Sequence, residues 1–169
     1  MKIWEFMATN MKPCVPGDSC AVVGAIMRRR QCGFVPVVDG LRTKRLVGVV
    51  TDRDILSHLV HLDSPPSRVA VRACMTDSSE SIAPDASLEA AVRVMKQAAV
   101  RWLPVVAGGQ LVGVLSLEDV ALAAHRQWAY VGLHVTEQHV VEIIEAIAVD
   151  RARRTRRPAA RRRHRRMHQ

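Results

Sequence analysis

The 169-residue chain has few aromatic side chains: phenylalanine, tryptophan and tyrosine together make up 4% of it. Because hydrophobic residues still reach 49%, we expect an aliphatic core of Val, Leu, Ile, Ala and Met. The chain lacks any run of the roughly 18 uncharged apolar residues that a membrane-spanning helix needs. Its first residues contain no apolar signal segment, and Glu5 falls where a signal peptide avoids an acid. The composition predicts a soluble cytoplasmic protein with no membrane partner.

Cysteine and histidine are sparse and irregularly spaced. The four cysteines are Cys14, Cys20, Cys32 and Cys74. No two of them have CxxC spacing, and histidines are not interleaved at zinc-finger spacing, so we expect reduced thiols and no metal site. His58 and His61 lie one helical turn apart, near Asp63, and can ligate a metal, but a third ligand at fixed spacing is missing. A coincidence on a helix surface is the favoured interpretation.

Lysine is rare, whereas arginine is abundant and concentrated at one end of the chain. The formal net charge is +9, and residues 151–169 contribute ten arginines and no acid, which leaves −1 for residues 1–150. A folded nucleic-acid-binding domain more often carries its positive charge on one face of the fold. We expect a disordered tail over 151–169. An association with nucleic acid or another polyanion through this tail is the alternative function that the sequence leaves open.

The chain contains an internal repeat. Equivalent residues lie 68 positions apart up to Val38 and 65 positions apart beyond it. The pairs include Met7 and Met75, Pro16 and Pro84, Ser19 and Ser87, Pro36 and Pro104, Gly48 and Gly113, Thr51 and Ser116, and Asp54 and Asp119. The predicted organisation is repeat one over 3–62, a linker over 63–70, repeat two over 71–127, a helical extension over 128–150, and the tail.

Each repeat has the pattern of a strand, a helix, two strands and a second helix. Residues 19–30 and 87–99 carry apolar stripes at helical spacing, and short apolar strands follow at 34–38 and 102–106. A helix with one apolar face is expected over 137–150. A small sheet with helices on one face leaves apolar surface uncovered, and packing two copies together covers it. The predicted fold class is α/β (α+β), with two tandem βαββα repeats in pseudo-twofold symmetry.

The strongest chemical signal is a hydroxyl and a carboxylate three residues apart where a strand meets a helix. Thr51 and Asp54 form this pair in repeat one, and Ser116 and Asp119 form it in repeat two. A helix N-terminus presents unpaired N–H groups that can bind a phosphate, and a carboxylate can accept hydrogen bonds from the two hydroxyl groups of a ribose. The same spacing also makes a helix-capping box, which needs no ligand. The occurrence of two copies in register favours a binding role.

These residues resemble the CBS (cystathionine-β-synthase) domain family. The resemblance rests on Met75, Pro84-Asp85-Ala86-Ser87-Leu88, Leu103-Pro104-Val105-Val106, Leu111-Val112-Gly113, Ser116 and Asp119, together with their counterparts in repeat one. It covers residues 3–127. The resemblance implies a homodimeric, non-enzymatic regulatory pair with up to two ligand sites. It also implies an adenosine-containing ligand, such as AMP, ADP, ATP or S-adenosylmethionine, rather than a required cofactor, and a separate regulated protein as partner.

The resemblance also implies which residues approach the ligand. Backbone near Cys14-Val15 and Ile82-Ala83 would read the adenine, and residues just before the central prolines would approach the phosphates. The full set is Cys14, Val15, Pro36, Thr51, Arg53, Asp54, Ile82, Ala83, Arg101, Pro104, Ser116 and Asp119. Arg101 is either a phosphate clamp or a solvated surface arginine. No arrangement of a catalytic nucleophile with a base is indicated, so we expect no enzyme activity.

The two candidate sites differ in one charge. Arg53 lies in the first helical turn of repeat one, and Glu118 takes the equivalent position in repeat two. A carboxylate opposes a phosphate at close range. The sequence therefore predicts that the Thr51 site prefers phosphorylated ligands and that the Ser116 site does not.

Overall fold

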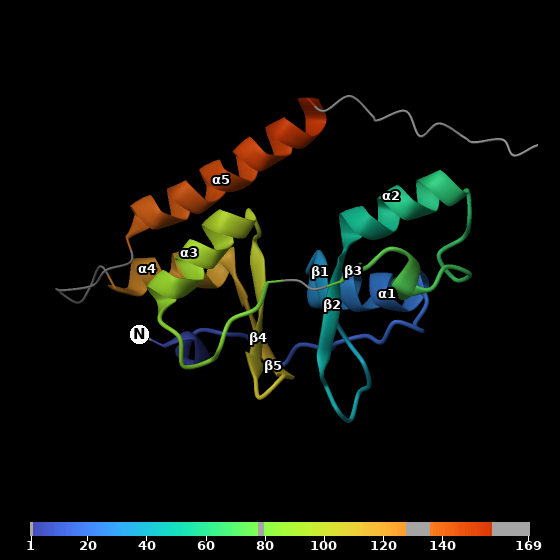
Figure 1. The fold of residues 1–169 in the computed structure, drawn as a ribbon, viewed down its shortest axis with the longest axis horizontal. Helices are drawn as coiled ribbons and strands as arrows, with labels where there is room; N and C mark the ends of the chain where they lie inside the picture. The colour runs from blue at the N-terminus through green and yellow to red at the C-terminus, as the bar shows by residue number, and fades with distance from the viewer. Residues whose placement is uncertain (1, 78–79, 128–135, 157–169) are drawn as a thin grey trace, which may run out of the picture.

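The computed structural model describes residues 2–77, 80–127 and 136–156, and it has two similar halves (Figure 1). In the first half, helix α1 (Cys20–Arg30) precedes strands β1 (Phe34–Val38) and β2 (Leu46–Thr51), and helix α2 (Asp52–Leu62) follows. In the second half, helix α3 (Leu88–Ala98), strands β4 (Trp102–Ala107) and β5 (Gln110–Ser116), and helix α4 (Leu117–Gln127) repeat that order. The predicted α+β repeats are confirmed.

The equivalent helices begin in the same way. The Oγ atom of Ser19 accepts a hydrogen bond from the backbone N–H of Val22 at the start of α1. Ser87 accepts the corresponding bond from Ala90 at the start of α3. A side-chain acceptor at this position satisfies one of the amides that a helix leaves unpaired at its N-terminus. The repeated serines therefore place the two helices alike in the two halves.

The segment that leads into each repeat packs on the other repeat, which the sequence did not predict. The 3-10 turn η1 (Ile3–Glu5) binds repeat two, where Ile3 N–H donates to Ala86 O at 3.1 Å and Ile3 is fully buried in that core. The turn η2 (Val71–Ala73) binds repeat one, where Val71 N–H donates to Asp18 O at 2.8 Å. The predicted boundaries at 3 and 71 follow the sequence repeat, but each folded half takes its first segment from the other.

The exchanged segments also complete the two sheets. Strand β3 (Thr76–Asp77) pairs with β2 in the order β1-β2-β3, although it belongs to the second repeat in sequence. In the other half, Ala8 pairs with Val114 of β5. A Cβ on Gly48 would lie 2.5 Å from the Thr76 oxygen, and one on Gly113 would lie 2.8 Å from Met7 Sδ. Glycine at both positions therefore allows the exchanged segment to approach the sheet closely.

A small apolar cluster of equivalent residues joins the two halves. Phe34 and Trp102 stack with ring centroids 5.4 Å apart and an interplanar angle of 18°. Val49 and Val114, which are also equivalent, are buried in the same cluster. Each half has a larger aliphatic core of its own. Contact between equivalent residues is what pseudo-twofold packing requires.

The last described helix, α5 (Glu137–Arg156), packs on α3 and α4 and lies on one side of the second half only (Figure 1). Ile143 is fully buried there. The helix runs six residues beyond the predicted end at Asp150, so Arg151–Arg156 are helical rather than disordered. Arginine is a strong helix former, which allows the turns to continue past the apolar face. The rest of the predicted tail lies outside the described residues. None of the described helices is long and apolar enough to cross a membrane.

Candidate functional site

Thr51 and Asp54 close a reciprocal cap at the start of α2. Thr51 Oγ1 donates to Asp54 Oδ2 at 2.7 Å, and Thr51 N–H donates to the same oxygen at 3.0 Å. In return, Asp54 N–H donates to Thr51 Oγ1 at 3.2 Å. Among the described residues, Oδ1 of Asp54 has no hydrogen-bond partner. The capping interpretation is therefore correct for the protein alone, and one carboxylate oxygen stays available to a ligand.

Ser116 and Asp119 repeat this geometry at the start of α4. Ser116 Oγ and Ser116 N–H donate to Asp119 Oδ2 at 2.7 and 2.8 Å, and Asp119 N–H donates to Ser116 Oγ at 3.0 Å. All four residues of the two caps are partly exposed. Each helix has one such cap, and the two caps form a pair of equivalent polar positions at the ends of β2 and β5.

The two caps flank the aromatic contact between the repeats. Phe34 is the cross-strand partner of Thr51, and Trp102 is the cross-strand partner of Ser116. Because Phe34 and Trp102 stack on each other, both strand ends approach the contact between the halves. The structure thus brings the two predicted hydroxyl-carboxylate pairs to either side of one apolar surface. Pro36 and Pro104, two residues farther along these strands, are buried within them.

The backbone expected to read an adenine is already paired with the sheets. Cys14 N–H donates to Pro36 O, and Cys14 O accepts from Val38 N–H, at 3.1 and 2.9 Å. Ile82 makes the same two bonds, with Pro104 and Val106, in the other half. A carbonyl oxygen has a second lone pair, so these residues can still accept a hydrogen bond but cannot donate one.

The next residues, Val15 and Ala83, differ in whether their backbone N–H groups are free to bind a ligand. Val15 N–H donates to Asp18 Oδ2 at 3.0 Å, so this donor is also occupied. The exposed Ala83 uses its carbonyl to accept from Ala86, and its own N–H has no partner among the described residues. Of the four predicted backbone readers, Ala83 alone keeps a donor for an adenine.

Arg101 lies beside the second cap. Its carbonyl accepts a hydrogen bond from Leu117 N–H at 2.8 Å, at the first residue of α4, and its side chain is exposed. The equivalent residue, Gly33, accepts from Asp52 N–H at 3.1 Å at the first residue of α2. The structure therefore places the backbone of Arg101 on the Ser116 side.

Asp52 is a residue that the sequence interpretation overlooked. Its carboxylate lies over Gly33, where a Cβ would be 2.9 Å from Asp52 Oδ2, and its Oδ1 accepts from Arg53 N–H at 2.7 Å. The equivalent residue, Leu117, is buried. A direct comparison of the two repeats could have identified this acid, because an exposed aspartate replaces a core leucine.

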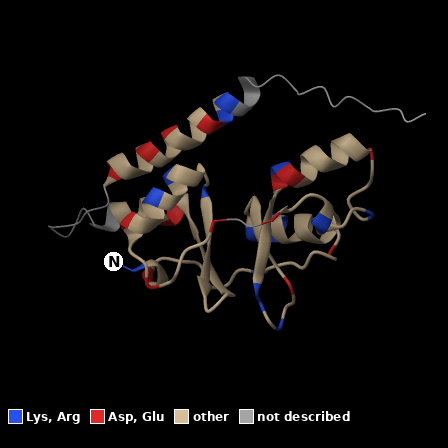
Figure 2. Cartoon of the chain, in the orientation of Figure 1, with Lys and Arg blue, Asp and Glu red and all other residues tan. Residues whose placement is uncertain are grey.

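Asp52 and Arg101 change the comparison of charge between the sites. Asp52, Arg53 and Asp54 have a formal sum of −1, and Arg101, Glu118 and Asp119 also have a formal sum of −1. Both signs of charge lie at the start of α2 in Figure 2. The expectation that the Ser116 site does not prefer phosphorylated ligands compared Arg53 with Glu118. When Asp52 and Arg101 are counted as well, the two sets of residues have equal formal charge, and the difference in ligand preference stays a prediction.

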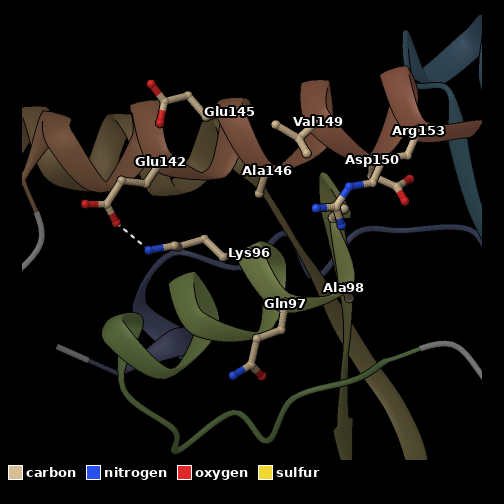
Figure 3. A pocket seen from close by; sticks show the side chains of 10 residues that line it. Lys96, Gln97, Ala98, Glu142, Glu145, Ala146, Val149, Asp150 and Arg153 are labelled. Atoms are coloured by element: carbon tan, nitrogen blue, oxygen red, sulfur yellow. Dashed lines mark hydrogen bonds and ion pairs between the residues drawn. The ribbon is translucent and has the colours of Figure 1, made fainter. Parts of the chain in front are cut away.

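A separate pocket of about 420 Å³ lies between the end of α3 and helix α5 (Figure 3). Lys96 of α3 points toward Glu142 of α5 and forms an ion pair with it at 2.5 Å. Hydrogen bonding to Lys96 lowers the pKa of Glu142 below its usual value. None of the twelve predicted ligand-binding residues lines this pocket.

Comparison with known proteins identifies the family of the two repeats. The sequence model of the CBS domain matches residues 3–61 and 71–126, which cover most of the chain. The chain belongs to the CBS-domain family. The CBS pair is 30% identical over 122 residues to the Bacillus subtilis protein YlbB, an alignment that covers 72% of this chain and 81% of YlbB.

Two further relatives of the CBS pair have known structures. The solved structure of CBSX2 in complex with AMP, a protein of Arabidopsis thaliana, is 30% identical with a TM-score of 0.64 and covers 74% of this chain and 96% of that one. Hypoxic response protein 1 of Mycobacterium tuberculosis is 27% identical over 130 residues, or 77% of this chain and 82% of the relative. The structural match to Hypoxic Response Protein I, with a TM-score of 0.65 and 23% identity over 72% of this chain and 98% of that one, shows the shared fold.

The structure of Hypoxic Response Protein I contains two coordinated zinc ions. In this CBS pair, the described residues include no group of three or more His, Cys, Asp or Glu side chains that could hold a metal. His58 is partly buried, its Nε2 has no partner within the described part of the chain, and His61 is exposed. The described part of the chain therefore lacks the three or four ligands that a zinc site needs.

Proposed function

We propose that this CBS pair is a non-catalytic regulatory module that binds an adenosine-containing ligand, either an adenine nucleotide or S-adenosylmethionine. The observation that carries the proposal is the pair of matching caps, Thr51 with Asp54 and Ser116 with Asp119, on either side of the Phe34–Trp102 contact. Helix capping alone does not require the N-termini of α2 and α4 to lie beside the same contact between the repeats.

The caps supply complementary groups for a nucleoside phosphate. Oδ1 of Asp54 and its equivalent in Asp119 can accept hydrogen bonds from ribose hydroxyls, because each cap uses only Oδ2. The first three amides of α2 already donate to Gly33 O, Asp52 Oδ1 and Thr51 Oγ1, so an anion at this helix start would be favoured by the helix dipole rather than by free N–H groups. Arg53 and Arg101, one beside each cap, add a charge that can pair with a phosphate.

The similarity to CBSX2 supports the choice of ligand. That protein was solved with AMP, and its 30% identity to this chain extends over 96% of its length. AMP is accordingly the first ligand to test. An adenine in either site would be recognised by carbonyl oxygens of Cys14 or Ile82, or by the Ala83 N–H, since the other backbone donors are occupied.

We further propose that the module is a homodimer formed through repeat one. Helix α5 covers α3 and α4, but no described element covers the equivalent outer face of α2. Leu56 and Val60, one turn apart on that face, are 65% and 75% exposed. A second copy of the chain is the simplest partner, because twofold pairing is the commonest way to bury a surface of this kind.

A thermal-shift screen of the full chain tests the proposed ligand class. AMP, ADP, ATP and S-adenosylmethionine are each added at millimolar concentration, with guanosine monophosphate as the control. A ligand that binds only the folded state raises the melting temperature. At a concentration of a hundred times its dissociation constant, it adds about 2.7 kcal/mol to the free energy of unfolding. We expect at least one adenosine compound to raise it and the guanosine compound not to. No shift with any of the four would contradict the proposal.

A further inference from the structure

Two cysteines far apart in sequence touch in the first half of the molecule. The Sγ atoms of Cys20 and Cys74 lie 3.6 Å apart. Cys20 is the first residue of α1 and is 1% exposed, whereas Cys74 follows η2 and is partly exposed. Neither thiol has a part in the proposed ligand sites. The contact joins the exchanged segment to the core of repeat one.

We propose that Cys20 and Cys74 are a modification site that forms a reversible disulfide. A disulfide has a sulfur separation of about 2.05 Å, so the two atoms must approach by about 1.5 Å from their present contact. Side-chain rotation at a partly exposed residue can supply most of this movement. Cys14, the third cysteine in this core, is directed elsewhere, because its thiol donates to Pro36 O at 3.8 Å.

Oxidised glutathione, or another small disulfide, is a suitable oxidant. The Cys74 thiolate attacks one sulfur of the small disulfide, which releases one thiolate and leaves a mixed disulfide on Cys74. The Cys20 thiolate then attacks the Cys74 sulfur and releases the second small thiolate. The two protein thiols lose two electrons and two protons, and the small disulfide becomes two thiols. The exposure of Cys74 makes it the first to react.

The groups around Cys74 affect the rate of this thiol–disulfide exchange through the pKa of Cys74. Burial raises the pKa of Cys74 to about 12, and the hydrogen bond with Cys20 and the negative charge of Asp54 act in the same direction. The thiolate is the attacking form, so little of it is present at neutral pH. The disulfide should therefore form more slowly than one between ordinary exposed thiols, and a later reductant should reverse it.

The disulfide would fix the segment that completes the first sheet. Cys74 directly precedes Met75 and Thr76, which lie within 2.7 Å of the position of a Cβ on Gly48. Strand β2 continues from Gly48 to Thr51, where the first cap begins. A bond from Cys74 to α1 would hold β3 against β2.

Peptide mapping tests this proposal. The full chain is incubated with oxidised glutathione at pH 8, the remaining thiols are alkylated, and the protein is digested with trypsin and Asp-N. Cleavage before Asp18 separates Cys14 from Cys20, so each thiol is assigned unambiguously. We expect a Cys20–Cys74 linked peptide that dithiothreitol removes. The linked peptide should persist in Cys32→Ser and be lost in Cys74→Ser. A stable glutathione adduct on Cys74 without the link, or a link to Cys32, would overturn the proposal.

Thermal unfolding of the same samples tests whether the bond fixes the segment. Oxidised wild type should melt about 5 °C or more above the reduced protein, because the bond closes a long loop in the unfolded chain. Cys74→Ser should melt at one temperature under both conditions. Equal melting temperatures for oxidised and reduced wild type would show that the bond does not stabilise this contact.

Discussion

At the scale of single residues, the caps show why residue type and role are hard to separate. Thr51 and Asp54 pair their backbone N–H groups through the Thr51 hydroxyl and one carboxylate oxygen of Asp54, as a capped helix start requires. The sequence identified these residues correctly as a polar pair, but it could not show which oxygen stays free. It also could not place Asp52 over Gly33 or Arg101 beside Leu117, because both depend on how a loop meets a helix.

Cys14 gives a prediction about stability and pH. Burial, with a smaller effect of Asp18, raises the pKa of this thiol to about 12, against an ordinary value of 9.0. Above pH 9 the unfolded chain loses this proton while the folded chain keeps it, so the unfolded state binds fewer protons and stability falls as pH rises. Between pH 8 and pH 10, this thiol should lower the free energy of unfolding by about 1.4 kcal/mol.

Urea unfolding under reducing conditions measures this effect. Cys14→Ala removes the titrating group, so its loss of stability between pH 8 and pH 10 should be smaller than that of wild type by this amount. The lysines and the tyrosine titrate in both proteins and cancel in the comparison. Parallel pH profiles for the two proteins would show that the Cys14 thiol is not protected by burial.

At the scale of elements, periodicity predicted the helices because each buries one face, and short apolar runs predicted strands such as β1, which is buried along its whole length. The stripe on residues 87–99 corresponds to α3, and the short apolar runs correspond to β1 and β4. The exchange of η1 and η2 between the halves could not be predicted in the same way. A repeat in sequence shows which segments are alike, whereas the partner of a segment depends on packing between the halves.

Gly48 tests this exchange directly. In Gly48→Ala, the new methyl group would lie 2.5 Å from the Thr76 oxygen of the exchanged strand. Backbone must move to relieve this overlap, so we expect a loss of about 1–3 kcal/mol in the free energy of unfolding. Chemical denaturation of wild type and variant measures it.

Gly24→Ala is the matched control. Gly24 lies within α1, and a Cβ there meets nothing within 4 Å. The same substitution should stabilise the protein by about 0.5–1 kcal/mol, because alanine favours a helix over glycine. If Gly48→Ala were as well tolerated as Gly24→Ala, the close approach of β3 to β2 would be wrong.

At the scale of the whole molecule, the two halves differ mainly in what covers their helices. Acidic residues lie along α5 where it packs on repeat two, and arginines lie near its C-terminal end (Figure 2). Repeat one has no such cover among the described elements, and Leu56 and Val60 face outward. The sequence predicted a dimer from the family resemblance, and the asymmetric position of α5 now suggests which face forms it.

The dimer can be tested by light scattering on the full chain. We expect a mass of twice 18.7 kDa for wild type. The double variant Leu56→Asp with Val60→Asp should be monomeric at the same concentration, since two buried carboxylates oppose association. Leu41→Asp, at a residue 59% exposed in the β1–β2 connection, should remain dimeric. A dimeric Leu56/Val60 variant would move the interface to another face, and a monomeric wild type would rule out the dimer.

The central claim is that a nucleotide binds at the two caps, and calorimetric titration of AMP tests it most directly. Asp54→Asn and Asp119→Asn each keep one side-chain oxygen to cap the helix. Each replaces the other oxygen, a hydrogen-bond acceptor, by an NH2 donor and removes the negative charge. Asp39→Ala is the control, because Asp39 lies at the opposite end of the strands from Thr51. We expect AMP to bind wild type and Asp39→Ala equally, and we expect each asparagine variant to weaken binding at one site by about tenfold or more. Unchanged AMP affinity in both asparagine variants would contradict the central claim.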